Sequence, residues 1–409
     1  MMTKRAHNFS KINIHACMKP VYLTTLTPLR GIAALLMVVF HFNLFVMPVI
    51  DPAITQLHRR WYLLVDFFFI LSGFIMVYVY GSGFAERVSG ASFGRYMAAR
   101  FARIYPLHLF SLLWVVGIYG WVVGLRHVKL DATTQLVFDP AAIPLHVFML
   151  HGFNTVWTAT WNTPAWSVGS EWLMYLLFPF LMPVFRRIPM AGKLVLVALM
   201  AGFYAYLTRP LAAGPPFKPW LPHISWMIDN IMFPDSFFRC LAGFVLGMIT
   251  HDLYQQQWAE RGLKRGIVFG GLGVGLAVAW HFLLPDLLTI WVFPLLILGA
   301  AYNTGRVATL LKTKLFQRLG DWSYSIYMVH IPIMFTFLAV QLANQPASAP
   351  KPGPTAVVYG SQGPITCLIY VMLVLAVSAL TYRFVEVPAR HWLNARLLVK
   401  ANRQPVAVS

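Results

Sequence analysis

The sequence predicts an all-α, polytopic integral membrane protein. The chain has 409 residues, of which 58% are hydrophobic and 11% are charged, and its mean hydropathy is +0.65. A soluble domain carries about 25% charged residues, so this composition argues against a soluble fold. Apolar runs of about twenty residues, each long enough to cross a bilayer core of about 30 Å, recur along the chain. We therefore expect a bundle of transmembrane helices.

Apolar runs between charged or Pro/Gly-rich breaks predict ten spans. They cover about 29–49, 61–81, 104–124, 166–185, 189–208, 231–250, 266–284, 286–304, 321–341 and 364–384. The stretch 141–153 is short and interrupted by proline, so we interpret it as interfacial or re-entrant. Residues 1–23 and 394–409 are polar, basic tails, which leaves 24–393 as one membrane domain.

Lysines and arginines concentrate on one side of this arrangement. With the N-terminus inside, 24 of them fall on the inner side and seven on the outer side, and Arg239 lies within a span. Cytoplasmic loops carry the excess of Lys and Arg, so we expect a multi-pass protein of the cell inner (plasma) membrane with both termini in the cytoplasm. The formal net charge of +19 then reflects orientation and contact with membrane lipids, and requires no nucleic acid.

The three cysteines, Cys17, Cys240 and Cys367, lie far apart in the chain. Their spacing matches neither a disulfide framework nor a zinc motif. The sequence therefore predicts no metal site.

The first span carries two polar side chains in an apolar segment, LRGIAALLMVVFH. Arg30 and His41 are eleven residues apart, which on an α-helix is about 16 Å of rise and returns to within roughly 20° of the same face. Ionisable groups at this depth are costly unless they face the protein interior or a water-filled cavity, which favours a functional role. The alternative is a snorkelling arginine and a histidine that hydrogen bonds to a neighbouring helix.

The next two spans contribute further candidates. Asp66, near the outer end of the second span, either orients a histidine or pairs with a cation, or it lies at the water boundary. The Ser72-Gly73 step favours a close helix contact. Arg100 and Arg103 share a helix face at the inner surface, where arginine forks match phosphate oxygens, although the motif taken alone favours anchoring to anionic lipid.

The central spans hold Glu171 and Arg239. Glu171 lies about one turn inside the fourth span, in the same outer half of the membrane as His41, so a Glu–His contact is geometrically allowed. Arg239 is deep in the sixth span and needs an anionic partner or a cavity. Glu171 and Asp235 are candidate partners.

The C-terminal spans carry two polar groupings. Ser323, Tyr327 and His330 recur at helical spacing on one face, either as a hydrophilic path or as interhelical hydrogen bonds. Arg383 and Glu386 are three residues apart, which predicts a local ion pair.

These segments in this order resemble the membrane-bound acyltransferase 3 family, whose members acylate cell-surface polysaccharides, Nod factors and some antibiotics. The resemblance covers about 24–393 and rests on Arg30-x10-His41, DFFFILSGF, Arg100-x2-Arg103, WSVGSEW, FFRCLAGFVLG, GDWSYSIYMVH and FVEVPAR. It implies a ten-helix acyltransferase that takes acyl groups, usually acetyl, from cytoplasmic acyl-CoA. The chain lacks the C-terminal SGNH-type hydrolase-like domain of longer members, so a two-domain relay of the acyl group is not expected.

Resemblance and residue chemistry together suggest a mechanism. Arg100 and Arg103, with Arg30 and Arg239 as further cations, bind the acyl-CoA donor, for which we expect no permanently bound cofactor. His41 acts as general base or takes the acyl group itself, and Glu171 or Asp66 orients its imidazole. The expected acceptor is a carbohydrate or lipid-linked glycan.

A transporter or flippase for a polar or lipid-linked solute is the alternative, with His41 and Glu171 as a proton relay. A purely structural membrane protein would leave the intramembrane ions unexplained.

Overall fold

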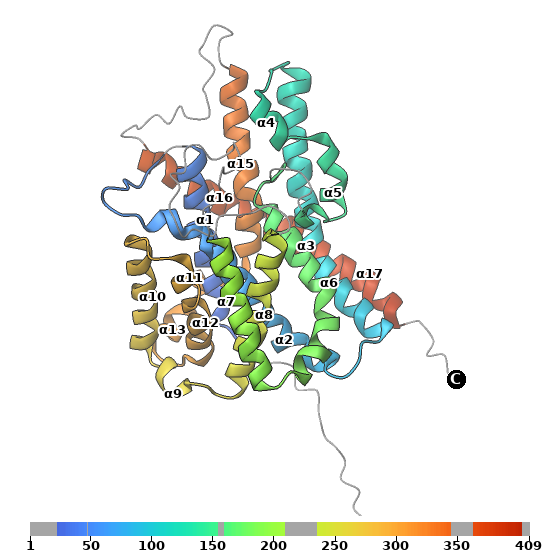
Figure 1. Cartoon of the computed structure of the whole chain (residues 1–409). Coiled ribbons are helices and arrows are strands. Elements are labelled where there is room, and N and C mark those ends of the chain that lie inside the picture. The colour runs from blue at the N-terminus through green and yellow to red at the C-terminus, as the bar shows by residue number, and fades with distance from the viewer. Residues whose placement is uncertain (1–22, 47, 154–158, 209–234, 345–362, 403–409) are drawn as a thin grey trace, which may run out of the picture.

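The computed structural model describes residues 23–46, 48–153, 159–208, 235–344 and 363–402, and these residues form a helical bundle (Figure 1). Seven helical runs in this part of the chain are long and apolar enough to cross a membrane. The prediction of an all-α, polytopic membrane protein is therefore confirmed. The count of ten spans and the cytoplasmic location of both termini stay predictions.

The long helices follow the predicted spans. They are α1 (Leu26–Phe45), α2 (Leu64–Tyr80), α3 (Gly90–Tyr119), α6 (Ala165–Arg187), α7 (Met190–Leu207), α8 (Asp235–Gln255), α10 (Gly266–His281), α12 (Val292–Tyr302), α15 (Ser323–Asn344) and α16 (Gly363–Thr381). A 3-10 turn, η1 (Leu57–Leu63), leads directly into α2, and α11 (Asp286–Thr289) precedes α12. Their bounds track the apolar runs because an intramembrane helix must satisfy its own backbone groups over the whole apolar length.

Short helices connect these spans. Four of them, α4 (Ala132–Val137), η4 (Pro140–Ala142), α5 (Ile143–Val147) and η5 (His151–Phe153), follow α3, and η5 packs against α6. The predicted non-crossing stretch 141–153 is thus a series of short turns. The others are η2 (Gly81–Phe84), η3 (Gly120–Leu125), α9 (Glu260–Leu263), α13 (Arg306–Leu311) and α14 (Lys314–Asp321).

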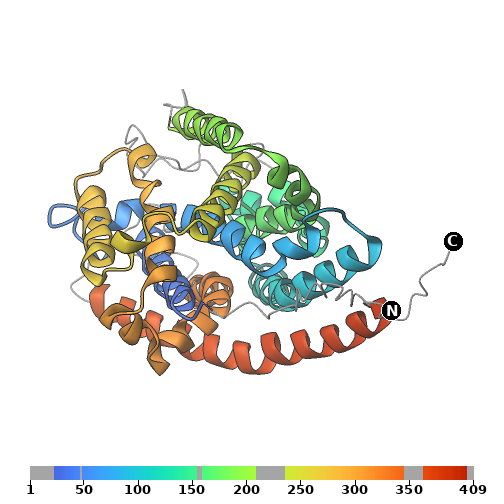
Figure 2. The same ribbon diagram turned by 90° about the horizontal axis from the view of Figure 1, so that it is seen from below.

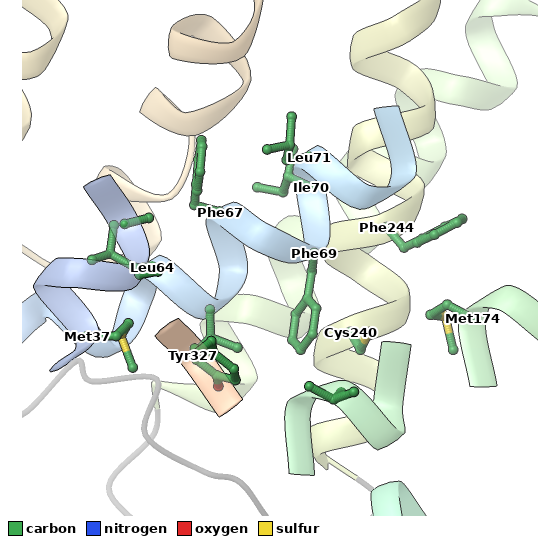
Figure 3. Close-up of a cluster of buried hydrophobic side chains, with 14 of the residues drawn as sticks. Met37, Leu64, Phe67, Phe69, Ile70, Leu71, Met174, Cys240, Phe244 and Tyr327 are labelled. Carbon is green, nitrogen blue, oxygen red and sulfur yellow. The ribbon is translucent and has the colours of Figure 1, made fainter. Parts of the chain in front are cut away.

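The centre of the bundle is the contact between α2 and α8, which Figure 3 shows with Phe69 and Ile70 of α2 beside α8. Two glycines bring the backbones together. A Cβ atom on Gly73 would lie 2.0 Å from the carbonyl oxygen of Phe244, and one on Gly247 would lie 1.9 Å from that of Ile70. The close contact expected at Ser72-Gly73 is confirmed, and it holds the polar residues of α2 and α8 in register.

The C-terminal helices form one continuous run along a side of the bundle, through α16, the π-helical segment η6 (Tyr382–Glu386) and α17 (Val387–Asn402) (Figure 2). The last of these, α17, packs against α3. It continues helically through position 394, where the sequence suggested that the membrane domain ends.

The sequence places Trp161 and Trp166 at the outer end of the fourth predicted span, a position typical of an interfacial belt, but both are buried. Trp161 is 1% exposed and donates its indole N–H to the carbonyl of Asp139 at 2.9 Å, and Trp166 is 8% exposed. Both serve as core residues near the start of α6. Trp157, Trp220 and Trp226 lie near the outer mouth in the predicted topology, where tryptophans anchor the interface or stack on sugars, and they fall outside the described residues.

Candidate active site

Two cavities that share three arginines lie inside the bundle. The first, which we call the arginine cavity, has a volume of about 470 Å³ and is lined by Arg30, Arg100, Arg103 and Arg390, with Asp321 as the carboxylate in its wall. The second, the bundle cavity, has a volume of about 150 Å³ and runs between α1, α2, α3, α6 and α15. Because Arg30, Arg100 and Arg103 line both, the two cavities adjoin.

The position of the arginine cavity follows from how its helices begin and end. Arg100 and Arg103 lie on α3, which starts at a capping box between Ser89 and Ser92. Arg30 lies near the start of α1, where a Cβ atom on Gly31 would be 2.5 Å from the carbonyl carbon of Leu319. This close approach of α1 and α14 brings Arg30 and Asp321 into one cavity. All these segments are at the ends predicted to face the cytoplasm.

Arg100 and Arg103 are each held by protein partners. Arg100 donates from Nη2 to the hydroxyl of Tyr80 at 2.7 Å. Arg103 forms an ion pair with Glu386, which also accepts a hydrogen bond from Ser325 at 3.0 Å. These contacts fix the guanidinium groups, so both arginines on one face of α3 point to the same space, as the three-residue spacing predicted.

The predicted Arg383–Glu386 pair is wrong, because Glu386 turns to α3. Both residues lie in the π-helical segment η6, which adds a residue to the local turn and so rotates the side chains away from α-helical spacing. Arg383 lies instead over the ring of Phe384, 5.4 Å from its centroid.

Glu171 lies in the wall of the bundle cavity. Its Oε1 accepts a hydrogen bond from the hydroxyl of Tyr175 at 2.6 Å, and that hydroxyl accepts one from Ser72 at 3.4 Å. The expected contact between Glu171 and His41 is therefore not observed in the described part of the chain. Glu171 and Tyr175 are one turn of α6 apart, so the Tyr175 hydroxyl reaches the Glu171 carboxylate within the same helix.

Asp66 and Arg239 are paired with each other, which confirms that Asp66 pairs with a cation and corrects the partner expected for Arg239. Arg239 Nε lies 2.9 Å from Asp66 Oδ1, and Nη2 lies 2.5 Å from Oδ2, with Asp66 0% and Arg239 1% exposed. Asp66 therefore does not orient His41. The partner of Arg239 is neither Glu171 nor Asp235, and Arg239 lines neither cavity, which argues against its assignment to donor binding. This buried pair joins α2 to α8.

His41 lies beside His330. The Nδ1 atom of His41 is 2.9 Å from the carbonyl oxygen of Met37 and 3.2 Å from Nε2 of His330. A carbonyl only accepts, so Nδ1 carries the proton in neutral His41 and Nε2 keeps its lone pair. His41 is 9% exposed and is not among the residues that line the two cavities.

Tyr327 links this histidine pair to the bundle cavity. It lines the cavity, its hydroxyl lies 2.8 Å from Ser167 Oγ, and its ring centroid is 5.8 Å from that of His330. The predicted face of Ser323, Tyr327 and His330 is thus partly cavity wall and partly interhelical hydrogen bonds. The bundle cavity also extends along α2 from Met76 to Val65, which are eleven residues or about 16 Å of helix rise apart. The same rise separates Arg30 from His41 on α1.

Sequence reasoning missed several residues of the site. They are Tyr175, Asp321, Glu386, Arg390 and the role of His330 as the neighbour of His41. His330 was detectable, because it shares a face with Tyr327. The others depend on the packing of segments that are distant in sequence.

Comparisons with known proteins agree with the resemblance. A family profile described as an acyltransferase domain, that of the acyltransferase 3 family, matches residues 26–383. The chain is 27% identical over 328 residues to Acyltransferase MdmB of Streptomyces mycarofaciens, covering 77% of this chain and 79% of that protein. It is 32% identical over 161 residues to Protein 2 in picA locus of Rhizobium radiobacter, covering 37% and 78%. No solved structure matches the chain. Since the profile spans most of the sequence, the chain belongs to the acyltransferase 3 family and is an acyltransferase.

Proposed function

We propose that the chain transfers an acyl group, acetyl in the first instance, from cytoplasmic acyl-CoA to a hydroxyl of a cell-envelope or exported carbohydrate. The observation that carries the proposal is the joined pair of cavities. A coenzyme A thioester has a polyphosphorylated head and a long, thin pantetheine arm. The arginine cavity offers four guanidinium groups to the head, and the bundle cavity offers a narrow, partly apolar path to the arm.

The donor would enter from the cytoplasm. The arginine cavity is built from the start of α1, the end of α2, residues 99–103 of α3 and residues of α17. The distribution of Lys and Arg predicts that these segments lie on the inner side. From there the bundle cavity leads along α2 towards its outer end. An acceptor on the outer side of the inner membrane would meet the thioester at the far end of this path.

His41 would supply the base. With its Nδ1 proton directed at the Met37 carbonyl, its Nε2 lone pair takes the proton of the acceptor hydroxyl. The hydroxyl oxygen then bonds to the thioester carbonyl carbon, the C–S bond breaks, and the departing thiolate takes the proton from the imidazolium. An acyl-histidine intermediate is the alternative route, in which Nε2 itself attacks the carbonyl carbon.

Arg30 and Glu171 would act on the donor path. Both line the bundle cavity, and the Tyr175 hydroxyl holds the Glu171 carboxylate in place. Arg30 lines both cavities, so its positive charge lies where the phosphate site opens into the path towards the thioester. We therefore move Glu171 from orienting His41 to shaping the path that the pantetheine arm takes.

The proposal is tested with protein in nanodiscs and in sealed vesicles. Release of free CoA thiol from acetyl-CoA, stimulated by a mixture of envelope glycans or short oligosaccharides, would support acyl transfer. Uptake of labelled oligosaccharide into vesicles without any acyl-CoA, together with absence of thiol release, would instead favour a transporter. A variant with Arg100→Ala serves as control, since it should weaken donor use without changing any donor-independent uptake.

A further inference from the structure

Three buried histidines meet beside α3, and none of them lines either cavity. They are His108 on α3, His146 on α5 and His151 on η5, which are 1%, 1% and 3% exposed. One potential ligand atom from each lies within 4.8 Å of the others, and this is the one such group among the residues that the structure describes.

The hydrogen bonds of the three rings use one nitrogen each. His108 Nε2 lies 2.9 Å from the carbonyl oxygen of His146, and His151 Nε2 lies 2.9 Å from that of Ala165. His146 Nε2 lies 2.9 Å from the hydroxyl oxygen of Thr160. Because carbonyls only accept, Nε2 carries the proton in neutral His108 and His151, and their Nδ1 atoms carry lone pairs.

All three Nδ1 atoms are buried and have no hydrogen-bond partner in the described structure. A buried polar atom without a hydrogen-bond partner destabilises the fold, so three together need an explanation. One water molecule has only two protons to donate, so it satisfies the three nitrogens only when His146 carries its proton on Nδ1 and donates to the water oxygen. A metal cation accepts all three Nδ1 lone pairs when His146 instead carries its proton on Nε2 and donates to the Thr160 hydroxyl. Metal-bound histidines typically donate their other ring N–H to a carbonyl, as His108 and His151 do.

We propose that His108, His146 and His151 bind one divalent transition-metal ion, with Zn²⁺ as the preferred ion. Neutral imidazole suits Zn²⁺ and its neighbours in the first transition row, and a water or hydroxide would complete a tetrahedral set. The ring planes are within 10° of parallel. Metal–nitrogen bonds of about 2.1 Å place the ligand nitrogens roughly 3.5 Å apart. Metal binding therefore rotates at least one imidazole ring out of the parallel arrangement and draws the three nitrogens together.

The site would be a structural tie for the wall of the bundle cavity. Next to His151, a Cβ atom on Gly152 would lie 2.4 Å from the carbonyl carbon of Gly169, so this segment is in close contact with α6. Gly169 stands between Val168 and Glu171, which line the bundle cavity. An ion that joins α3 to His146 and His151 would hold that stretch of α6 in place, whichever reaction the cavity supports.

The test measures metal directly, in protein purified without a polyhistidine tag. After treatment with a chelator and reloading with ZnCl₂, elemental analysis should find about one Zn²⁺ per chain in the wild type and in His251→Gln, a control at a buried histidine outside the cluster. The triple variant His108→Gln/His146→Gln/His151→Gln should lose at least nine-tenths of it.

A second readout covers the case in which the triple variant fails to fold. Co²⁺-loaded wild type should show visible d–d absorption that Zn²⁺ displaces, and X-ray absorption should find nitrogen or oxygen neighbours at about 2.0–2.1 Å, with imidazole scattering. Folded wild type that takes up no Zn²⁺ or Co²⁺, or a folded triple variant that retains its metal, overturns the proposal. Neither result depends on acyl transfer.

Discussion

The Nε2 atom of His330 lies 3.2 Å from the Nδ1 atom of His41, so residues from α15 and α1 form one buried imidazole pair. The Met37 carbonyl already accepts from His41 Nδ1 at 2.9 Å, and His330 is anchored where the Tyr370 hydroxyl donates to its backbone carbonyl at 2.7 Å. His330 thus restricts the ring orientation of His41 from the side opposite its Nε2 lone pair. We assign it a positioning role.

We expect His330→Ala to lower kcat for acyl transfer by up to about 100-fold, since misplacing a catalytic group by about 1 Å can cost that much. The donor KM should change little because the arginine cavity is intact. His330→Asn, which keeps a polar atom near His41, should recover part of the rate. An increase of KM with unchanged kcat would place His330 on the donor path instead.

The arginine pair on α3 should control donor affinity. Replacing Arg100 or Arg103 by Ala should raise the KM for acetyl-CoA about tenfold or more, because hydrogen bonds to charged groups contribute about 1.5–3 kcal/mol. Steady-state kinetics with dephospho-CoA thioesters should show a smaller effect. Arg186→Ala, at an exposed arginine near the end of α6, is the matched control. An equal KM for acetyl-CoA in all variants would mean that Arg100 and Arg103 anchor the protein to anionic lipid and do not bind the donor.

Asp321 should oppose donor binding, as the carboxylate that lines the arginine cavity. Asp321→Asn removes a charge of the same sign as the donor phosphates, and two like charges at close range repel by about 1 kcal/mol in water. The KM for acetyl-CoA should therefore fall severalfold at low ionic strength, and less so in high salt. Glu260→Gln, which removes a carboxylate from α9, should leave KM unchanged. A rise in KM would mean that Asp321 orients an arginine that the donor needs.

The Asp66–Arg239 pair should stabilise the bundle rather than act on the donor. Removing one partner of a buried ion pair typically costs about 3–5 kcal/mol. Asp66→Asn should therefore lower the thermal unfolding temperature strongly, and Asp66→Asn/Arg239→Met should be less damaging than the single change. Thermal unfolding in detergent measures both. An unaltered unfolding temperature with a raised donor KM would restore Arg239 to the donor site.

Helix positions were predictable from the sequence because bilayer thickness and backbone hydrogen bonding set the length of each apolar run. The span 166–185 appears as Ala165–Arg187, and 104–124 is the second part of the longer helix α3 with its π-helical extension η3. Short-range features were predictable too. The spacing of Arg100 and Arg103 places both in the same cavity, and Gly73 allows the close contact with α8.

Partners across helices were not predictable, because they depend on the rotation of each helix about its axis. Asp66 and Arg239 are 173 residues apart, and Arg103 and Glu386 are 283 apart. Arg383, three residues away, is a plausible local partner for Glu386, yet the π-helical segment turns Glu386 towards α3. The histidine cluster was not predictable for a similar reason: His108 and His146 are 38 residues apart, and no cysteine spacing marks the site.

The most direct test of the account follows radiolabelled acetyl-CoA with purified protein in nanodiscs, comparing wild type, His41→Ala and His391→Ala, a change at an exposed histidine of α17. Wild type and His391→Ala should release CoA thiol, because the acetyl group either passes to an acceptor or is slowly hydrolysed. His41→Ala should bind the donor and unfold at the wild-type temperature, yet release none. Undiminished release from folded His41→Ala would contradict the account, since the proposed chemistry has no other base.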